Sequence, residues 1–517
     1  MAIEPNLKYP SESRTSVDKP VGDVDLVENL PSQNVPHFYV PRTPQEAALD
    51  RSINMKLDFI VLPLLAFNFM LCGIDKTNIG NAATTSFAKD AHLKPNDISN
   101  AVSLLSVTFV TLQPLSTIIG RRVGVKYWIS FMMVAWVSLC MAHAGINNRE
   151  KLIALRLLLG AAEAGFVPSV FFYLSTWYPK YHLGFRLGLF AGMYSIAGAF
   201  SGLIAYGVFK IHSSKYKSWQ LLFMIEGGIT IFAVLITFFA LPLKQTSAWF
   251  LSKAEREHSL HRMDIDVMKN FEVDQDGNAI KDTRMVSMRD VKAVLTDWKK
   301  LLTVVFNILA TLPVSAFGTF LPLIVKGMGY SGVQANLMSV SPFVVGAFGL
   351  FIFVYSSDHF HERSLHTVTS MALALIGLIV MYTSSDPHLR YGFTHVCLAG
   401  AFSAGPLIVG WLANNTPLLG PRSLIIGING YSNIAGIIAG QLFKAQYAPS
   451  YGYPLKITMI LIGVGMLGFL GMRGAYMYEN RWRAKQIAGW DEEQRRAEDR
   501  GENGRRGDQR RTFTFTY

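Results

Sequence analysis

Charged side chains interrupt long apolar segments of this 517-residue chain, among them Asp75, Lys76, Arg156, Glu163 and Glu226. A charged side chain at the centre of a lipid bilayer costs about 2.5–3.5 kcal/mol on insertion scales, so such residues occur mainly where they face protein or water. Acids and bases gathered in this way can bind a charged solute and can hold or release protons. These residues are therefore the first candidates for a functional site.

Arg156 and Glu163 are seven residues apart in KLIALRLLLGAAEAGFVP, which places them on one helix face, about 10 Å apart along the axis. Counted from the segment ends, Asp75 and Arg156 fall at neighbouring depths, and Glu163 falls near the bilayer midplane. We therefore expect Asp75, Lys76, Arg156 and Glu163 to face one internal polar cavity. An unpaired carboxyl group in apolar surroundings favours its neutral form, so Glu163 is the predicted proton carrier.

Simpler roles compete with this interpretation. Asp75 and Lys76 could be solvated residues just beyond a helix end, and Arg156 could be a static strut that bonds helix-end carbonyls. Glu163 could also be a strut, although a midplane carboxylate is costly in that role. Glu226, in WQLLFMIEGG, is nearer a segment end and precedes two glycines, so a structural role is the better interpretation there.

The composition indicates an integral membrane protein. Half of the residues are hydrophobic, only 16% are charged, and the mean hydropathy is +0.27. The first 55 residues are polar, so we predict no cleavable signal peptide. The three cysteines all lie in apolar runs, and the histidines of HFHERSLH have no second cluster to face. We therefore expect no disulfide framework, no metal site and no cofactor.

Twelve apolar stretches have about the 20 residues that are needed to cross a hydrocarbon core about 30 Å thick. They cover residues 57–80, 98–119, 127–145, 151–174, 187–208, 219–241, 301–325, 334–355, 365–384, 391–413, 423–443 and 456–478. An even number places both termini on one side. The loops of that side hold about twice as many Lys and Arg residues as the opposite loops, so we expect both termini in the cytosol.

The charge distribution predicts five regions. These are a mostly disordered cytosolic tail over residues 1–55, a six-helix half over 56–241, a cytosolic loop over 242–300, a second six-helix half over 301–480 and a disordered cytosolic tail over 481–517. The last tail, which contains RRAEDRGENGRRGDQRR, interleaves acidic and basic residues without apolar periodicity. Its basic charge therefore indicates a solvated segment and not a nucleic-acid partner.

Small residues recur at spacings of three and four in GAAEAG, AGMYSIAGAFSG and GINGYSNIAGIIAG. Such spacing permits close helix contacts in lipid, both in sliding and in static bundles. The third of these motifs also carries Asn429 and Asn433, one helical turn apart.

Several motifs, in this order over about residues 45 to 485, resemble the major facilitator superfamily. They are the IDKTNIGNA end of the first span, RLLLGAAEAGFVPSVFFYLSTWYP, WQLLFMIEG and SAWFLSKAERE. More narrowly, they resemble its anion:cation symporter family, in the fungal allantoate, nicotinate, biotin and pantothenate permease group.

The resemblance implies an all-α fold of twelve transmembrane helices in two six-helix halves. It also implies a carrier, expected to work as a monomer in the plasma membrane, that imports a small organic anion, such as a vitamin-like or nitrogen-source carboxylate, together with protons. In the implied mechanism, the substrate carboxylate takes over the cations and Asp75 is released to carry a proton. The implied substrate-binding residues are Lys76, Arg156, Tyr194, Asn429 and Asn433, and the proton-coupling residues are Asp75 and Glu163.

Two positions depart from the family pattern. Lys76 stands where the group usually has Arg, so it keeps the charge but loses bidentate geometry. In IIGRRVGVKYW, the superfamily's loop pattern survives only as Arg122, Gly124 and Lys126, with Arg121 in the place of its Asp. The equivalent loop of the second half, SSDHFHER, retains Asp358. We assign Arg122, Gly124, Lys126, Asp358 and Glu226 gating or structural roles.

Three other functions compete with an importer. An efflux antiporter of the same fold is the nearest alternative, but the Gly-Pro pair of multidrug subfamilies is missing from AGMYSIAGAFSGLIAYG. A non-transporting nutrient sensor would add a long structured cytosolic domain. A membrane-embedded enzyme would need a catalytic cluster that the sequence does not supply, so we expect no enzymatic activity.

Overall fold

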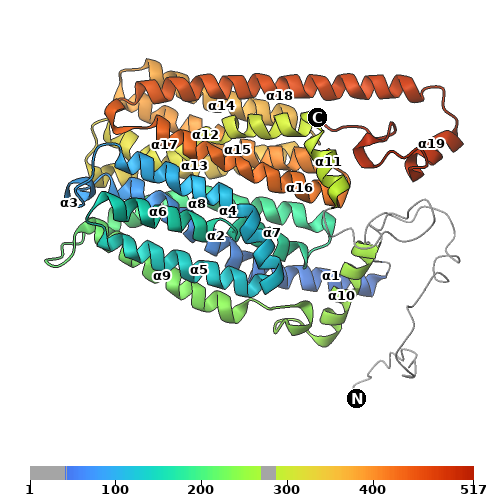
Figure 1. Ribbon diagram of the computed structural model, residues 1–517, viewed down its shortest axis with the longest axis horizontal. Helices are drawn as coiled ribbons and strands as arrows, with labels where there is room; N and C mark the ends of the chain where they lie inside the picture. Colours follow the sequence, from blue (N-terminus) through green and yellow to red (C-terminus); the bar gives the residue numbers. More distant parts are fainter. Residues whose placement is uncertain (1–40, 42, 269–286) are drawn as a thin grey trace. The chain divides into compact units, whose positions relative to one another are not determined.

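Membrane-spanning helices dominate the computed structural model, which describes residues 41, 43–268 and 287–517. Every regular element in these residues is helical, and twelve helices are long and apolar enough to cross a membrane. Six of them precede residues 269–286 and six follow. The predicted all-α class and the twelve spans are therefore confirmed (Figure 1).

We call the first six spans the first half and the last six the second half. The first half contains α1 (Pro44–Lys56), η1 (Leu57–Val61), α2 (Leu62–Ala82), α4 (Asp97–Val123), α5 (Val125–Ala142), η2 (His143–Gly145), α6 (Arg149–Glu163), α7 (Phe166–Ser175), α8 (Lys180–Val208) and α9 (Ser218–Ala240). The second half contains α12 (Trp298–Lys326), α13 (Gly332–His359), α14 (Ser364–Thr383), α15 (Pro387–Asn414), α16 (Leu419–Asn429), η4 (Gly430–Asn433), α17 (Ile434–Leu442) and α18 (Gly452–Ile487). Shorter elements are α3 (Phe87–Asp90), η3 (Gln245–Ser247), α10 (Lys253–Met268), α11 (Met288–Leu295), η5 (Ala445–Tyr447), α19 (Glu492–Arg500) and η6 (Gly507–Gln509).

Two spans are interrupted where the sequence supplies glycine. The fourth span breaks between α6 and α7 at Ala164 and Gly165, directly after Glu163. A Cβ at Gly165 would lie 1.8 Å from Ser116 Oγ of α4, so only glycine permits this approach. The eleventh span changes to the 3₁₀ turn η4 between α16 and α17. The first break places Glu163 at a helix end in the protein interior.

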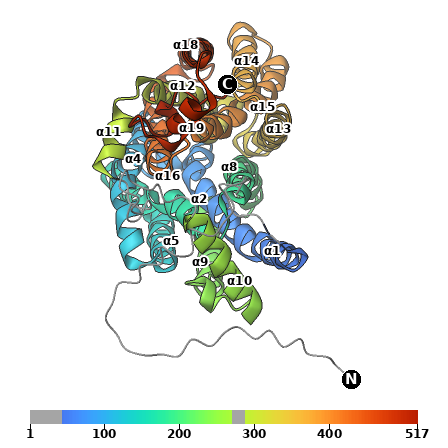
Figure 2. The same ribbon diagram turned by 90° about the vertical axis from the view of Figure 1, so that its right-hand side faces the viewer.

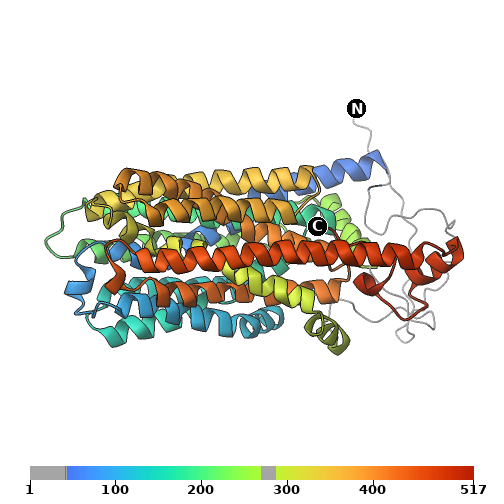
Figure 3. The same cartoon turned by 90° about the horizontal axis from the view of Figure 1, so that it is seen from above.

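Glycine-lined contacts join the two halves. α8 packs against α13 (Figure 2). α4 packs against α17. A Cβ at Gly198 would lie 2.5 Å from the Phe343 ring, and one at Gly440 would lie 2.3 Å from Ser103 Oγ. The small-residue motifs of α8 and of α16–α17 therefore serve the contact between the halves. In Figure 3, α18 is the long red helix of the second half, which packs against α12 and α14.

Hydrogen bonds tie the halves together at the ends that the charge distribution predicts to lie outside. The Lys326 ammonium donates to the Thr84 carbonyl at 2.8 Å, and Asn336 Nδ2 donates to Thr84 Oγ1 at 2.9 Å. Ser103 Oγ, near the start of α4, donates to the Ile437 carbonyl of α17 at 3.1 Å. The predicted outer side is therefore closed in this structure.

The opposite ends are held by ion pairs within each half. Arg186 and Asp58 pair at 2.6 Å in the first half. In the second half, Lys300 pairs with Asp508 at 2.6 Å. Because these ion pairs do not cross between the halves, they stabilise each half as a unit.

The start of the chain and its central loop contain more helix than predicted. Residues 44–56 form α1, although the expected disordered tail covers 1–55. The expectation for residues 1–40 lies outside the described residues. The loop predicted over 242–300 contains η3, α10 and α11. The division into halves over residues 56–241 and 301–480 stays a prediction.

α10 packs on α1 through a buried carboxylate. Glu255 accepts hydrogen bonds from Lys56 Nζ at 2.7 Å, from Ser52 Oγ at 2.6 Å and from the backbone N–H of Ser252 at 2.7 Å. Burial alone would raise the pKa of Glu255, but these donors outweigh that effect and lower the pKa to about 2. This explains the SAWFLSKAERE motif, because its Ser and Glu join the central loop to the first span.

Acid should loosen α10. The unfolded segment binds a proton more readily than folded Glu255, so the contact is at full strength above about pH 4.5 and weakens as the pH falls toward about 2. Hydrogen exchange of residues 253–268 in the purified protein should therefore rise between about pH 5 and about pH 3, after correction for the intrinsic exchange rate. Glu255→Gln should show the raised exchange already at neutral pH. Glu257→Gln, which changes an exposed neighbour, is the control, and equal exchange in both variants would contradict the clamp.

The end of the chain is ordered, which corrects the expectation of a disordered tail over residues 481–517. α18 continues beyond the membrane span, and α19 follows it. Phe515 is 3% exposed, and its backbone N–H and carbonyl bond the Asn480 side chain at 2.9 and 2.8 Å. The Thr516 carbonyl accepts a hydrogen bond from Trp411 Nε1 at 2.8 Å. The cause is the alternating TFTFTY sequence, whose period of two is not detected by a search for helical periodicity.

Candidate functional site

Lys76 and Glu163 form an ion pair in the interior of the first half. Lys76 Nζ lies 3.6 Å from Glu163 Oε2, and the two side chains are 18% and 0% exposed. The same ammonium lies 3.7 Å from the centre of the Phe109 ring of α4, within the range of a cation–π contact. Lys76 is therefore held by a carboxylate and an aromatic face, and it remains partly accessible.

Asp75 leaves α2 on a different face from Lys76. Successive residues of an α-helix are about 100° apart around its axis, so the two side chains leave α2 on different faces. Asp75 is 1% exposed and accepts a hydrogen bond from Cys140 Sγ of α5 at 3.1 Å. The acid that pairs with Lys76 is therefore Glu163 and not its neighbour Asp75, and the single polar cavity expected for these residues stays a prediction.

Arg156 is the second cation of this region. It is 1% exposed, and both Asp75 and Glu163 act on it electrostatically. Its Nε and Nη2 atoms have no hydrogen-bond partner among the described residues. A static strut would use these nitrogens to bond helix-end carbonyls, so the strut interpretation is not favoured. A guanidinium with free donors can instead bind a carboxylate through two parallel hydrogen bonds.

Close helix packing positions these residues. A Cβ at Gly160 of α6 would lie 2.2 Å from the Leu105 carbonyl of α4, so this glycine permits the backbones to approach. α6 therefore packs tightly on α4. Lys76 thus meets Glu163 of α6 and the Phe109 ring of α4.

Tyr194 of α8 belongs to the same region. Its charge interactions include Lys76 and Glu163, and a Cβ at Gly318 of α12 would lie 3.5 Å from its hydroxyl oxygen. The tyrosine thus reaches from the first half toward the second half beside Lys76. The structure brings this predicted residue together with the ion pair.

The two predicted asparagines of the second half are arranged differently. Asn429 is 5% exposed and accepts a hydrogen bond from Asn307 Nδ2 of α12 at 2.8 Å. Asn433 donates to the Gly430 carbonyl of its own turn at 2.9 Å and is exposed. Asn307 is not among the predicted site residues, although a single amide inside the apolar run LLTVVFNILATL is a signal for it.

The residues assigned gating or structural roles are scattered. Gly124 ends α4 with a φ of 103°, a left-handed conformation that favours glycine. Arg122 is exposed, and Lys126 Nζ lies 5.6 Å from the centre of the Phe238 ring. Asp358 pairs with Arg363 in its own loop.

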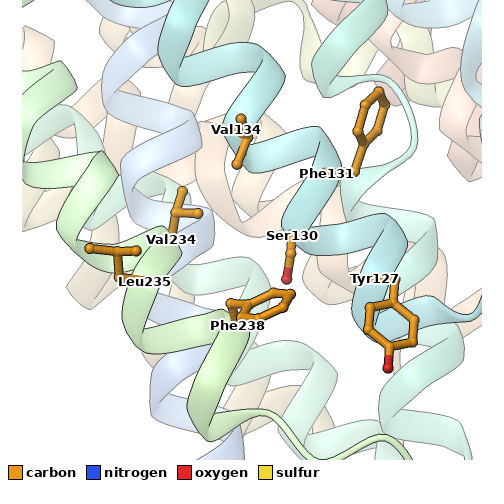
Figure 4. Close-up of a pocket in the computed structure, with 7 residues that line it drawn as sticks. All are labelled: Tyr127, Ser130, Phe131, Val134, Val234, Leu235 and Phe238. Atoms are coloured by element: carbon orange, nitrogen blue, oxygen red, sulfur yellow. The ribbon is translucent and has the colours of Figure 1, made fainter.

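Figure 4 shows a groove of about 370 Å³ between α5 and α9. It is lined by Tyr127, Ser130, Phe131, Val134, Val234, Leu235 and Phe238. Phe131 and Phe238 are 60% and 41% exposed, as expected of a face that meets lipid. None of the candidate charged residues lines this groove, so it is not the candidate site.

Comparisons with known proteins place the chain in a family. The family model described as the Major Facilitator Superfamily matches residues 65–440. The MFS-type transporter efuF of Hormonema carpetanum is 35% identical over 439 residues, covering 84% of this chain and 87% of that protein. The high-affinity nicotinic acid transporter of Saccharomyces cerevisiae is 28% identical, covering 80% of this chain and 75% of its own length.

The fold has solved counterparts. The crystal structure of a D-xylose-proton symporter superposes with a TM-score of 0.60 at 13% identity, covering 80% of this chain and 96% of that one. Together with the twelve spans and the matched family model, this likeness confirms the fold that the sequence motifs predicted. The chain belongs to the major facilitator superfamily, a family of membrane transporters and not of enzymes.

Proposed function

We propose that the protein is a proton-coupled symporter that imports a small organic anion by alternating access. The observation that carries the proposal is the buried Lys76–Glu163 ion pair beside an Arg156 with free donors. A site of this kind offers two cations and an exchangeable acid to an incoming carboxylate. Both termini in the cytosol and a plasma-membrane location are parts of the proposal.

In the proposed cycle, the substrate carboxylate competes with Glu163 for Lys76 and is bound through two hydrogen bonds by Arg156. Glu163, released from its cation inside an apolar environment, then takes up a proton. With its charges neutralised, the loaded protein can change from the outward-facing to the inward-facing state, because no net charge has to be desolvated. This assigns to Glu163 the exchange that the sequence analysis gave to Asp75.

The substrate class is a small carboxylate, vitamin-like or a nitrogen source. The nicotinic acid relative supports this class, since its name describes an aromatic carboxylate. Phe109 and Tyr194 beside Lys76 also offer aromatic surface to a flat anion. We therefore place nicotinate first in a panel of candidate substrates.

Uptake assays test the function directly. Yeast cells that lack their own carboxylate permeases and express this protein should accumulate a labelled carboxylate, with nicotinate tested first. Accumulation should be stronger at about pH 5 than at about pH 7, because the inward proton gradient drives it. A protonophore should remove the difference. Faster exit of substrate from loaded cells at acid external pH would instead favour an efflux antiporter.

Substrate binding should require a positive charge at position 76, but it should not require the shape of a lysine side chain. Lys76→Ala leaves Glu163 buried without a cation and should weaken apparent affinity by about thirtyfold or more, the equivalent of about 2 kcal/mol. Lys76→Arg, which restores the residue usual in the resembled group, should be tolerated. Lys89→Ala, on the exposed side chain of α3, is the control. Unchanged affinity in Lys76→Ala, at matched surface expression, would contradict a substrate-binding role.

A further inference from the structure

Glu226 is an acid that the proposed cycle does not use. It lies in α9, is 2% exposed, and neither carboxyl oxygen has a hydrogen-bond partner among the described residues. No ion pair of the described residues includes it, and burying a charge without a partner is costly. A carboxyl group in this position is most stable with a proton bound.

A second acid faces it. Asp75 of α2 acts electrostatically on Glu226, and Asn78, one turn further along α2, points its amide toward the same carboxyl group. The Oδ2 atom of Asp75 is also without a partner among the described residues. We call Asp75 and Glu226 the inner acid pair. Two neighbouring carboxyl groups resist carrying two negative charges, so the pair holds a proton more readily than either acid alone.

The other titratable and charged groups around the inner acid pair come from α5 with η2 and from α6. From α5 and η2, Cys140 donates its hydrogen bond to Asp75, and His143 is fully buried with its Nε2 atom unpartnered among the described residues. From α6, both Glu163 and Arg156 act electrostatically on Asp75. Glu163 is paired with Lys76, so Arg156 is the cation that faces Asp75. One cation cannot neutralise two ionised acids, so one proton completes the charge balance.

The inner acid pair lies on other helix faces than the ion pair of Lys76 and Glu163, although Glu163 also acts electrostatically on Asp75. The separation follows from the helices themselves, because Asp75 and Lys76 leave α2 on different faces. Arg156 and Glu163, seven residues apart on α6, likewise reach different depths, about 10 Å apart. Arg156 is the link, because it faces both Asp75 and Glu163.

We propose that the inner acid pair is a second proton-binding site, which adds one transported proton to the one bound at Glu163. The proposal rests on the proposed symport function. When Arg156 binds the substrate carboxylate, it neutralises Asp75 less, and the proton bound between Asp75 and Glu226 is retained through the inward transition. When the anion leaves, Arg156 returns to Asp75 and the proton is released. This replaces the structural role assigned to Glu226 from the sequence.

Proton binding can be tested without any substrate. Infrared difference spectra of the purified protein, recorded between acid and alkaline pH, report the carbonyl band of protonated carboxylic acids. Glu226→Gln should remove one component of this band, whereas Glu226→Asp, which keeps a carboxyl group, should retain it. Thr230→Val removes a buried hydroxyl one turn along α9 and serves as the packing control. An unchanged band in Glu226→Gln would overturn the proposal.

Coupling is tested in proteoliposomes with labelled nicotinate and a pH-sensitive dye inside the vesicles. Glu226→Gln should lower the number of protons that enter with each anion by one, while Thr230→Val should leave the ratio unchanged. An unchanged number of protons per anion in Glu226→Gln would show that the proton of the inner acid pair is not transported, and would overturn the second coupling site. Absence of proton entry with the anion in the unmodified protein would count against the proposed function itself, and the infrared result would still decide whether the inner acid pair binds a proton.

Discussion

Glu163→Gln should abolish proton-driven accumulation while exchange of labelled for unlabelled anion persists. Glutamine has the shape of a protonated glutamate but cannot ionise, so it imitates the proton-loaded state permanently. Glu163 is fully buried and holds Lys76 at 3.6 Å. Its replacement frees Lys76 for the substrate and removes the group whose proton release drives the return step.

The measurement is uptake against a concentration gradient at neutral pH, compared with counterflow in preloaded vesicles. Uptake should fall to passive equilibration, whereas counterflow should remain. Glu257→Gln, which removes an exposed carboxylate of α10, should behave like the unmodified protein. Full concentrative uptake by Glu163→Gln would exclude Glu163 from the coupling mechanism.

Gly80→Ala should stop transport for a steric reason. A Cβ at Gly80 of α2 would lie 1.7 Å from the Thr319 carbonyl oxygen of α12, far inside van der Waals contact. α2 and α12 belong to different halves, so the added methyl group prevents the closed arrangement of the predicted outer side. We expect the protein to fold and to favour an arrangement open on that side, with transport lowered about tenfold or more.

Thiol labelling measures this shift. Ser103, which is 3% exposed at the contact of α4 with α17, can be replaced by cysteine with little change in shape. Because the native cysteines are all buried, an impermeant thiol reagent added from outside should label this position faster in the Gly80→Ala background. Gly207→Ala is the matched control, since no atom lies within 4 Å of a Cβ there. Normal uptake by Gly80→Ala would contradict the closure argument.

Hydropathy alone predicted the twelve spans because lipid imposes a fixed length on every helix that crosses it. The same constraint identified the buried charged residues, since charges inside apolar runs are rare. Their pairing could not be predicted in this way. Whether Glu163 or Asp75 meets Lys76 depends on the rotation of α2 and on the break after α6, and neither is encoded in residue depth.

The contribution of the second half was harder to predict. Asn307 meets Asn429 only because α12 packs beside η4, and Asn433 turns back to its own backbone. The ordered end of the chain depends on the aromatic residues of TFTFTY, which alternate with threonines, and an average over the charged tail hides this pattern. The roles of the predicted site residues therefore stay predictions until transport is measured.

The glycine-lined contacts between the halves are repeated under an approximate twofold symmetry. α8, the fifth span of the first half, meets α13, the second span of the second half, and α17 of the eleventh span meets α4 in the same relation. We call the α8–α13 and α4–α17 contacts the two seams. Ser195 Oγ donates a hydrogen bond to the Phe343 carbonyl across the first seam, and Ser103 Oγ donates one to the Ile437 carbonyl across the second. Because rigid halves cannot open one seam alone, a single covalent cross-link across either seam would hold both shut and arrest the whole cycle.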